Sequence, residues 1–157
     1  MDDRAVQFVN SLIGKKLLSF CCECEILDFD FEPLVLHAMG CSRIIKNNDI
    51  LVTTLDYQSW DQVESTNNDE WFNSRKFNSE ITGGSVISVE LSPWNDLCIK
   101  LDNGVIIECL IANAYPHFEE EMEQWMLFEH TKDYSGTFLT VYNKSVDFVL
   151  GADRKNY

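Results

Sequence analysis

Positive charge is what this sequence has least of. Lysine and arginine together number 12 in 157 residues, against 26 aspartates and glutamates, which gives a formal net charge of −14. Nucleic acids and anionic membranes are polyanions, so a surface of this charge repels them. The same charge attracts a basic partner and speeds the encounter with it, although acidity that serves only solubility explains the bulk charge equally well.

Long apolar segments are missing as well. No run approaches the roughly 20 consecutive apolar residues of a membrane-spanning helix. Residues 1–4 read Met-Asp-Asp-Arg, unlike the basic start of a secretory signal, and no long apolar segment follows them. We therefore expect a cytoplasmic protein whose cysteines are reduced thiols. These are Cys21, Cys22, Cys24, Cys41, Cys98 and Cys109.

Motifs that carry catalysis or bind cofactors are also absent. The chain contains no P-loop, no G-x-G-x-x-G and no G-x-S-x-G nucleophile elbow. Cys21 and Cys24 have a zinc-like spacing, but a strand would direct them to opposite faces, and no second pair completes a site. The histidines His37, His117 and His130 are isolated. We expect a protein that is not an enzyme and holds no metal or cofactor.

The clearest pattern that the chain does contain spans residues 85–112 and predicts three consecutive strands. Apolar and polar residues alternate on either side of two turns, as half-buried strands require. The first turn holds Pro93, which cannot donate to a strand ladder, and the second holds Asn103 and Gly104. An Asn-Gly pair between alternating apolar runs favours a two-residue type I′ hairpin, because both residues tolerate positive φ.

The other elements are predicted from local patterns of the same kind. Residues 3–13 have apolar side chains at three- and four-residue intervals, which indicates a helix capped by Asp2 or Asp3 and ended at Gly14. The apolar face changes sides near Ile26, which predicts a bulge or a turn there. Strands are expected at 15–24, 25–32, 34–38, 43–45, 50–55, 123–129, 137–142 and 146–150.

Two segments fit these patterns less well. Residues 56–79 are polar and lack alternation, so we expect a long connection with one or two short helical turns. Residues 118–130 fit a helix or a strand, and propensity favours a polar turn at 118–122 followed by the strand at 123–129. Together the elements predict a single α+β domain over residues 1–157, mostly antiparallel β-sheet meander, with a short N-terminal helix packed on it.

Acidic residues gather beside aromatic side chains in two places, within residues 56–71 and within 119–125. A contact with a basic protein needs aromatic side chains, which supply buried area, and carboxylates, which steer the encounter. The simpler explanation, tryptophans in the core and acids on a solvated rim, applies at least as well to either place alone. The candidate partner-binding residues are Asp56, Trp60, Asp61, Asp69, Glu70, Trp71, Glu119, Glu120 and Glu121.

The central meander and its exit resemble a known group of proteins. The residues concerned are Val89-Glu90-Leu91-Ser92-Pro93, Asp96-Leu97, Leu101-Asp102-Asn103-Gly104 and Glu123-Gln124-Trp125. This part of the chain, residues 85–130, resembles small bacterial immunity proteins of polymorphic toxins, including contact-dependent growth inhibition immunity proteins. In β-rich families of this kind, a strand that reads acidic residue, any residue, tryptophan follows such a hairpin.

The resemblance implies a cytosolic protein that binds and blocks the toxic domain of its own cell's secreted toxin. Many such toxins are nucleases with basic active-site clefts, which an acidic inhibitor would occupy by mimicking the charge of nucleic acid. The resemblance supplies no toxin-contact residue, so the candidate binding residues depend on charge. The alternative function is an adaptor that binds an unrelated basic partner without catalysis.

Overall fold

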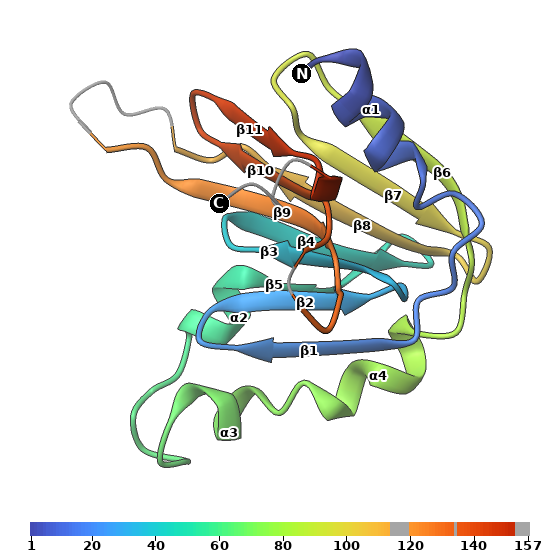
Figure 1. Cartoon of the computed structure of the whole chain (residues 1–157). Coiled ribbons are helices and arrows are strands. Elements are labelled where there is room, and N and C mark those ends of the chain that lie inside the picture. Colours follow the sequence, from blue (N-terminus) through green and yellow to red (C-terminus); the bar gives the residue numbers. More distant parts are fainter. Residues whose placement is uncertain (114–119, 134, 153–157) are drawn as a thin grey trace.

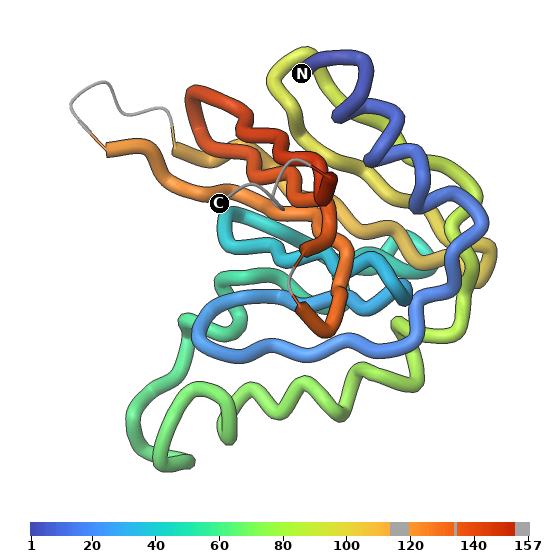
Figure 2. The backbone as a smooth tube through the Cα atoms, in the orientation of Figure 1, coloured from blue at the N-terminus to red at the C-terminus, as the bar shows by residue number. Residues whose placement is uncertain are grey.

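The computed structural model describes residues 1–113, 120–133 and 135–152, and in these residues the strands form two antiparallel sheets (Figures 1 and 2). The six-stranded sheet has the order β1 (Ser19–Glu23), β2 (Ile26–Asp30), β3 (Leu34–Ala38), β9 (Glu123–Glu129), β10 (Phe138–Tyr142), β11 (Val146–Val149). The five-stranded sheet has the order β5 (Asp49–Thr53), β4 (Cys41–Lys46), β8 (Val105–Leu110), β7 (Leu97–Leu101), β6 (Val86–Leu91).

One hydrophobic core joins the two sheets. Along β8 the side chains alternate as the sequence predicts, because Val105, Ile107 and Cys109 are buried while the residues between them are only half-buried. Most other strands of the two sheets also contribute buried side chains, whereas β11 contributes the partly buried Val146 and Phe148. The largest fully buried side chains include Trp125, Phe20, Phe29, Leu27 and Leu36 from the six-stranded sheet and Ile44, Leu97 and Ile99 from the five-stranded sheet.

Four short helices are described. The first, α1 (Asp3–Asn10), is capped by Asp2, whose Oδ1 accepts a hydrogen bond of 2.8 Å from the amide of Ala5, and it buries Ala5 and Val9. The others, α2 (Thr54–Gln58), α3 (Asn68–Phe72) and α4 (Arg75–Ile81), follow β5. Within the described residues, no helix is both long and apolar enough to cross a membrane.

The free edge of β1 is covered by α4. The side chain of Asn78 donates to the carbonyl of Phe20 at 2.7 Å and accepts from the amide of Phe20 at 3.1 Å. This pair of bonds uses the backbone groups that an edge strand would otherwise offer to another chain. The helices α3 and α4 therefore lie along β1, at the bottom of Figure 1.

The structure confirms the predicted fold class, an α+β fold dominated by antiparallel sheet with an N-terminal helix. The strands expected at 34–38 and 123–129 have those bounds as β3 and β9. The change of apolar face near Ile26 is a tight turn, in which Cys24 and Glu25 both have positive φ. The connection after β5 is more helical than expected, because α2, α3 and α4 all form within it.

The prediction of a type I′ turn at Asn103 and Gly104 is wrong. The loop between β7 and β8 contains three residues, 102–104, and only Gly104 has positive φ, at 83°. Three-residue hairpin loops place a left-handed residue last, where glycine is favoured. The side chain of Asn103 instead donates to the carbonyls of Ile81 and Thr82, which holds the loop against the end of α4.

Gly104→Ala is expected to lower the free energy of unfolding by about 1 kcal/mol, because its positive φ is unfavourable for a residue with a Cβ. The nearest atom to an added Cβ is Oδ1 of Asn47 at 3.9 Å, so crowding contributes nothing. Urea unfolding of both proteins measures the difference. Gly104→Asn is the matched control and should lose less, since asparagine tolerates this conformation. Equal losses in the two variants would contradict the backbone explanation.

Candidate functional site

The first predicted acidic cluster lies in the segment that follows β5 and leads, through α4, to β6 at the opposite edge of the same five-stranded sheet. Residues 54–72, here called the α2–α3 segment, run from α2 through a loop to α3, which lies at the bottom of Figure 1. Its four predicted carboxylates, Asp56, Asp61, Asp69 and Glu70, are all exposed. Their side chains are nevertheless held in place by local hydrogen bonds.

Asp56 and Asp61 each use one carboxylate oxygen to fix the backbone. Oδ2 of Asp56 accepts from the amide of Thr53 at 2.7 Å, in a capping box at the start of α2. Oδ1 of Asp61 accepts from the amides of Val63 and Glu64 at 2.8 and 3.2 Å. Neither carboxylate has its other oxygen bonded to a described residue, so each presents a positioned acceptor to solvent.

Asp69 and Glu70 follow the same pattern on α3. Oδ1 of Asp69 accepts from the hydroxyl of Tyr57 at 2.7 Å and from the amide of Cys24 at 3.3 Å. Oε2 of Glu70 accepts from the hydroxyl and the amide of Thr66, at 2.6 and 3.0 Å, and these two bonds hold the pKa of Glu70 below its ordinary value. Burial, followed by the bond to Asp69, raises the pKa of Tyr57.

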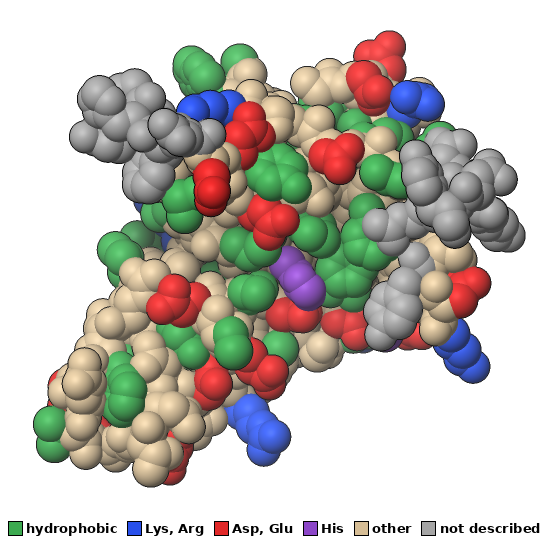
Figure 3. Space-filling view, turned by 60° about the vertical axis from the view of Figure 1, so that its left-hand side comes forward, with side chains coloured by type: hydrophobic (Ala, Val, Ile, Leu, Met, Phe, Trp, Pro, Cys, Tyr) green, Lys and Arg blue, Asp and Glu red, His purple; other side chains and the backbone are tan. Residues whose placement is uncertain are grey.

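These four carboxylates carry uncompensated charge. The ion pairs between described residues join Asp2 to Arg4, Asp28 to His37, Glu108 to Arg43 and Glu90 to Lys100. None of them includes a carboxylate of the α2–α3 segment. Figure 3 shows the same imbalance over one whole face, where carboxylates are spread widely and few lysine or arginine side chains are visible. The field around the segment is therefore negative.

The structure brings Asp56 and Trp71 together in one groove. This groove, called the β5 groove, has a volume of about 380 Å³ and lies beside β5, the edge strand of the five-stranded sheet. Trp60 and Trp71 are both half-buried. Trp71 packs against the hydrophobic core, whereas Trp60 does not. The groove is lined by Ile50, Leu51, Thr53, Asp56, Trp71, Phe72 and Phe77.

Aromatic side chains in and behind the wall of the β5 groove pack against one another. The rings of Phe72 and Phe77 stack with their centroids 5.6 Å apart, and Tyr57 meets Phe72 edge-on at 6.0 Å. Ile50, which also lines the groove, is 56% exposed. The lining of the groove is thus mostly apolar and includes the carboxylate of Asp56.

The second predicted acidic cluster lies at the other end of the molecule. Glu119 is outside the described residues, whereas Glu120 and Glu121 are exposed, and Glu121 accepts a hydrogen bond from the hydroxyl of Ser145 in the β10–β11 turn. Burial, assisted by the nearby carboxylates of Glu123, Asp147 and Glu121, raises the pKa of Tyr142. The tryptophan beside this cluster in sequence, Trp125, is fully buried and presents no surface to a partner.

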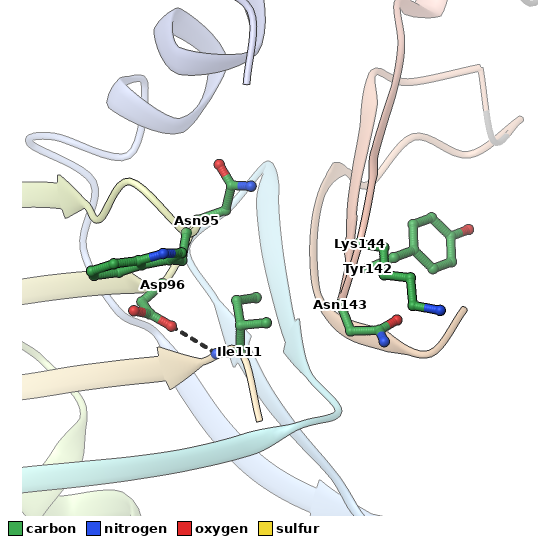
Figure 4. Close-up of a pocket in the computed structure, with 7 residues that line it drawn as sticks. Asn95, Asp96, Ile111, Tyr142, Asn143 and Lys144 are labelled. Atoms are coloured by element: carbon green, nitrogen blue, oxygen red, sulfur yellow. Dashed lines mark hydrogen bonds between the residues drawn. The ribbon is translucent and has the colours of Figure 1, made fainter. Parts of the chain in front are cut away.

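Sequence reasoning missed Trp94 as a candidate contact and treated it as part of a turn. Its side chain is 74% exposed, and it lines a cleft of about 460 Å³ between the β6–β7 and β10–β11 turns. Asn95, Asp96 and Ile111 form one side of this cleft, and the β10–β11 turn forms the other (Figure 4). A tryptophan between proline and asparagine in a turn was the available signal, because turns lie at the surface.

Nucleophilic chemistry by the buried cysteines is disfavoured. All six cysteines are free thiols, and burial raises the pKa of Cys22 and of Cys109 to about 12 and that of Cys21 to about 11. The thiolate is the reactive form, so these thiols are poor nucleophiles at neutral pH. In the described part of the chain, no three side chains of His, Cys, Asp or Glu are grouped to hold a metal.

Cys24 and Cys41 are expected to react first with a thiol reagent at pH 8, because they are the exposed thiols. Cys22 and Cys109 should stay protected until the protein unfolds, since their pKa values lie near 12. Absorbance with Ellman's reagent measures the two phases, and mass spectrometry identifies the modified residues. All six should react quickly in denaturant. Rapid labelling of Cys109 in the folded protein would contradict the expectation.

Comparison with models of protein families, with curated proteins and with solved structures found no match to this chain. Function is therefore inferred from the two surfaces themselves. The α2–α3 segment combines aromatic side chains with four exposed carboxylates, whereas the Trp94 cleft is lined by one carboxylate, Asp96, and by Lys144.

Proposed function

We propose that this chain is an immunity protein, which binds the basic toxic domain of a cognate toxin one to one and blocks its active-site cleft. The observation that carries this proposal is the β5 groove, where Asp56 lies together with Trp71, a residue of the acidic helix α3. An aromatic side chain with carboxylates near it is the combination that a tight contact to a basic protein needs. The resemblance of residues 85–130 to toxin immunity proteins supports a toxin as the partner.

Local hydrogen bonds make the acidic surface suited to mimic a nucleic acid. In a nuclease, lysine and arginine side chains bind the phosphates of the substrate. Asp56, Asp61, Asp69 and Glu70 each keep one bonded oxygen and offer the other. Because these carboxylates are already fixed, little side-chain freedom is lost when they pair with the toxin.

The proposed inhibition needs no catalysis. The inhibitor would act by occupying the cleft, so its effect would follow the stoichiometry of binding and not turnover. It would act in the cytosol, where the toxin reaches its target. Neither nucleic acid nor membrane would bind it, since both carry the same sign of charge.

Co-expression with the product of the gene immediately upstream tests the proposal. A basic domain that co-purifies at one-to-one stoichiometry, and that is toxic when expressed alone, would support it. Asp56→Asn should weaken that complex without unfolding the protein, because the amide oxygen can still accept from Thr53. Asp133→Asn, which removes one charge from a carboxylate that also accepts a backbone hydrogen bond but does not line the groove, is the matched control and should bind normally. An upstream product that is harmless and does not bind would overturn the proposal and favour an adaptor with an unrelated basic partner.

A further inference from the structure

An exposed tryptophan stands on the turn between β6 and β7, residues 92–96, far from the β5 groove. Trp94 lines the cleft shown in Figure 4, and its turn lies in the upper part of Figure 1, whereas α3 lies at the bottom. We infer that Trp94 anchors a second protein-binding surface, which takes an arginine- or lysine-bearing segment of a basic protein. This inference goes beyond the proposed function and does not depend on it.

The turn that carries Trp94 is fixed by the side chain of Ser92. Its hydroxyl oxygen accepts from the amides of Trp94 and Asp96, at 3.2 and 3.1 Å, and its proton is donated to Oδ2 of Asp96 at 2.8 Å. The amide and carbonyl of Ser92 also bond across the turn, to the carbonyl of Asp96 and the amide of Asn95, both at 3.0 Å. The backbone under Trp94 is therefore already ordered before any partner arrives.

Bonds to two other parts of the fold attach the turn to the body of the protein. Nε1 of the fully buried Trp125 donates to the carbonyl of Asn95 at 2.9 Å. Oδ1 of Asp96 accepts from the amide of Ile111 at 2.7 Å, the bond drawn in Figure 4. An apolar side chain on so well-supported a turn can be buried by a partner with little loss of conformational freedom. Tryptophan is among the residue types enriched in binding hot spots.

The charges around the cleft select the partner. Asp96 lines the cleft, and the adjoining hollow, which shares Asn95 and Lys144 with it, is lined by further carboxylates. Glu121 accepts a hydrogen bond from the hydroxyl of Ser145 in the β10–β11 turn. The carboxylates around the cleft are Asp2, Asp96, Glu121, Glu123 and Asp147, beside the ammonium group of Lys144.

A basic segment fits this surface better than a second copy of the chain does. Two copies would each bring a net charge of −14 and would set these carboxylates against one another. A guanidinium group satisfies both parts of the surface, because it stacks on an indole face and pairs with carboxylates. An ammonium group satisfies the same two parts with less directional bonding.

Titration with a hexa-arginine peptide, followed by NMR of the indole Nε1–H signals, tests the inference. We expect the Trp94 signal to shift and saturate, together with the amides of the β10–β11 turn. Hexa-citrulline, which has the same shape without the charge, is the matched control probe and should cause no saturable shift. Raising the salt concentration should weaken the arginine peptide's binding.

Substitutions assign the binding to the surface. Trp94→Ala should weaken the peptide's affinity for this surface about tenfold, the size of a moderately desolvated cation–π contact. Trp94→Phe should lose less, and Asp56→Asn should leave the shifts at the β10–β11 turn unchanged. The inference is overturned if the Trp94 signal stays still while that of Trp71 moves, or if Trp94→Ala leaves the shifts at the β10–β11 turn as they were.

Discussion

Neutralising the four carboxylates of the α2–α3 segment should slow association with a basic toxin domain by about tenfold to a hundredfold at low salt, because steering by charge contributes that much to encounter rates. The variant carries Asp56→Asn, Asp61→Asn, Asp69→Asn and Glu70→Gln. Each amide oxygen can still accept the hydrogen bond that its carboxylate oxygen accepts now. The fold should therefore survive, and the loss should appear in the association rate.

Stopped-flow association over a range of salt concentrations measures this effect. The unaltered chain should associate more slowly as salt rises, whereas the neutralised variant should show a much flatter dependence. A matched control removes four charges elsewhere, with Asp3→Asn, Asp30→Asn, Glu32→Gln and Asp133→Asn. Equal slowing in both variants would mean that net charge alone acts, and an unchanged rate in the first would remove the electrostatic part of the proposal.

The strands of the two sheets could be predicted from the sequence, because the alternation of apolar and polar residues that indicates a strand is a local pattern. Alternation along 34–38 and 123–129 reports which side chains share a face, and β3 and β9 have those bounds. The loop at 102–104 could not be predicted from its Asn-Gly pair. The conformation of this loop is stabilised by hydrogen bonds from Asn103 to the carbonyls of Ile81 and Thr82, which are distant in sequence.

The candidate site could be predicted only in part, for the same reason. The sequence places Asp56 and Trp71 in one acidic segment, but the groove they line also needs Ile50 and Phe77 from other elements. Asp69 is tied to Cys24 across 45 positions of the chain. Contacts of this range depend on how the helices pack on β1, which no local pattern encodes.

Trp125, in the second acidic region, and Trp94, in the β6–β7 turn, have roles that the sequence does not separate. Trp125 lies in a strand with apolar neighbours, and its exposure depends on which face of β9 meets the other sheet. In the structure the side chain of Trp125 lies on the face of β9 that packs in the core, so Trp125 is buried. Trp94, in its turn, is exposed. The exposed tryptophan near this region is Trp94, and the buried Trp125 donates a hydrogen bond to the carbonyl of its neighbour Asn95.

Trp125→Ala should destabilise the protein by about 3–5 kcal/mol, the usual loss for a fully buried tryptophan truncated to alanine. A domain of this kind has only about 5–15 kcal/mol of stability in total, so this variant can fail to fold. Trp125→Phe keeps most of the ring in the core and removes the Nε1 donor, and we expect it to lose about 1–2 kcal/mol. Urea unfolding, followed by circular dichroism, measures both.

Trp94→Ala is the matched control, because it removes the same side chain from a position that is 74% exposed. Its stability should change by less than about 0.5 kcal/mol, as surface substitutions usually do. Trp125→Phe has a second expected consequence, since the carbonyl of Asn95 loses its bond to the core. The turn of Trp94 should loosen, and the arginine peptide should bind this variant more weakly although Trp94 is intact. Unchanged peptide binding in Trp125→Phe would mean that Ser92 and Asp96 hold the turn without help from the core.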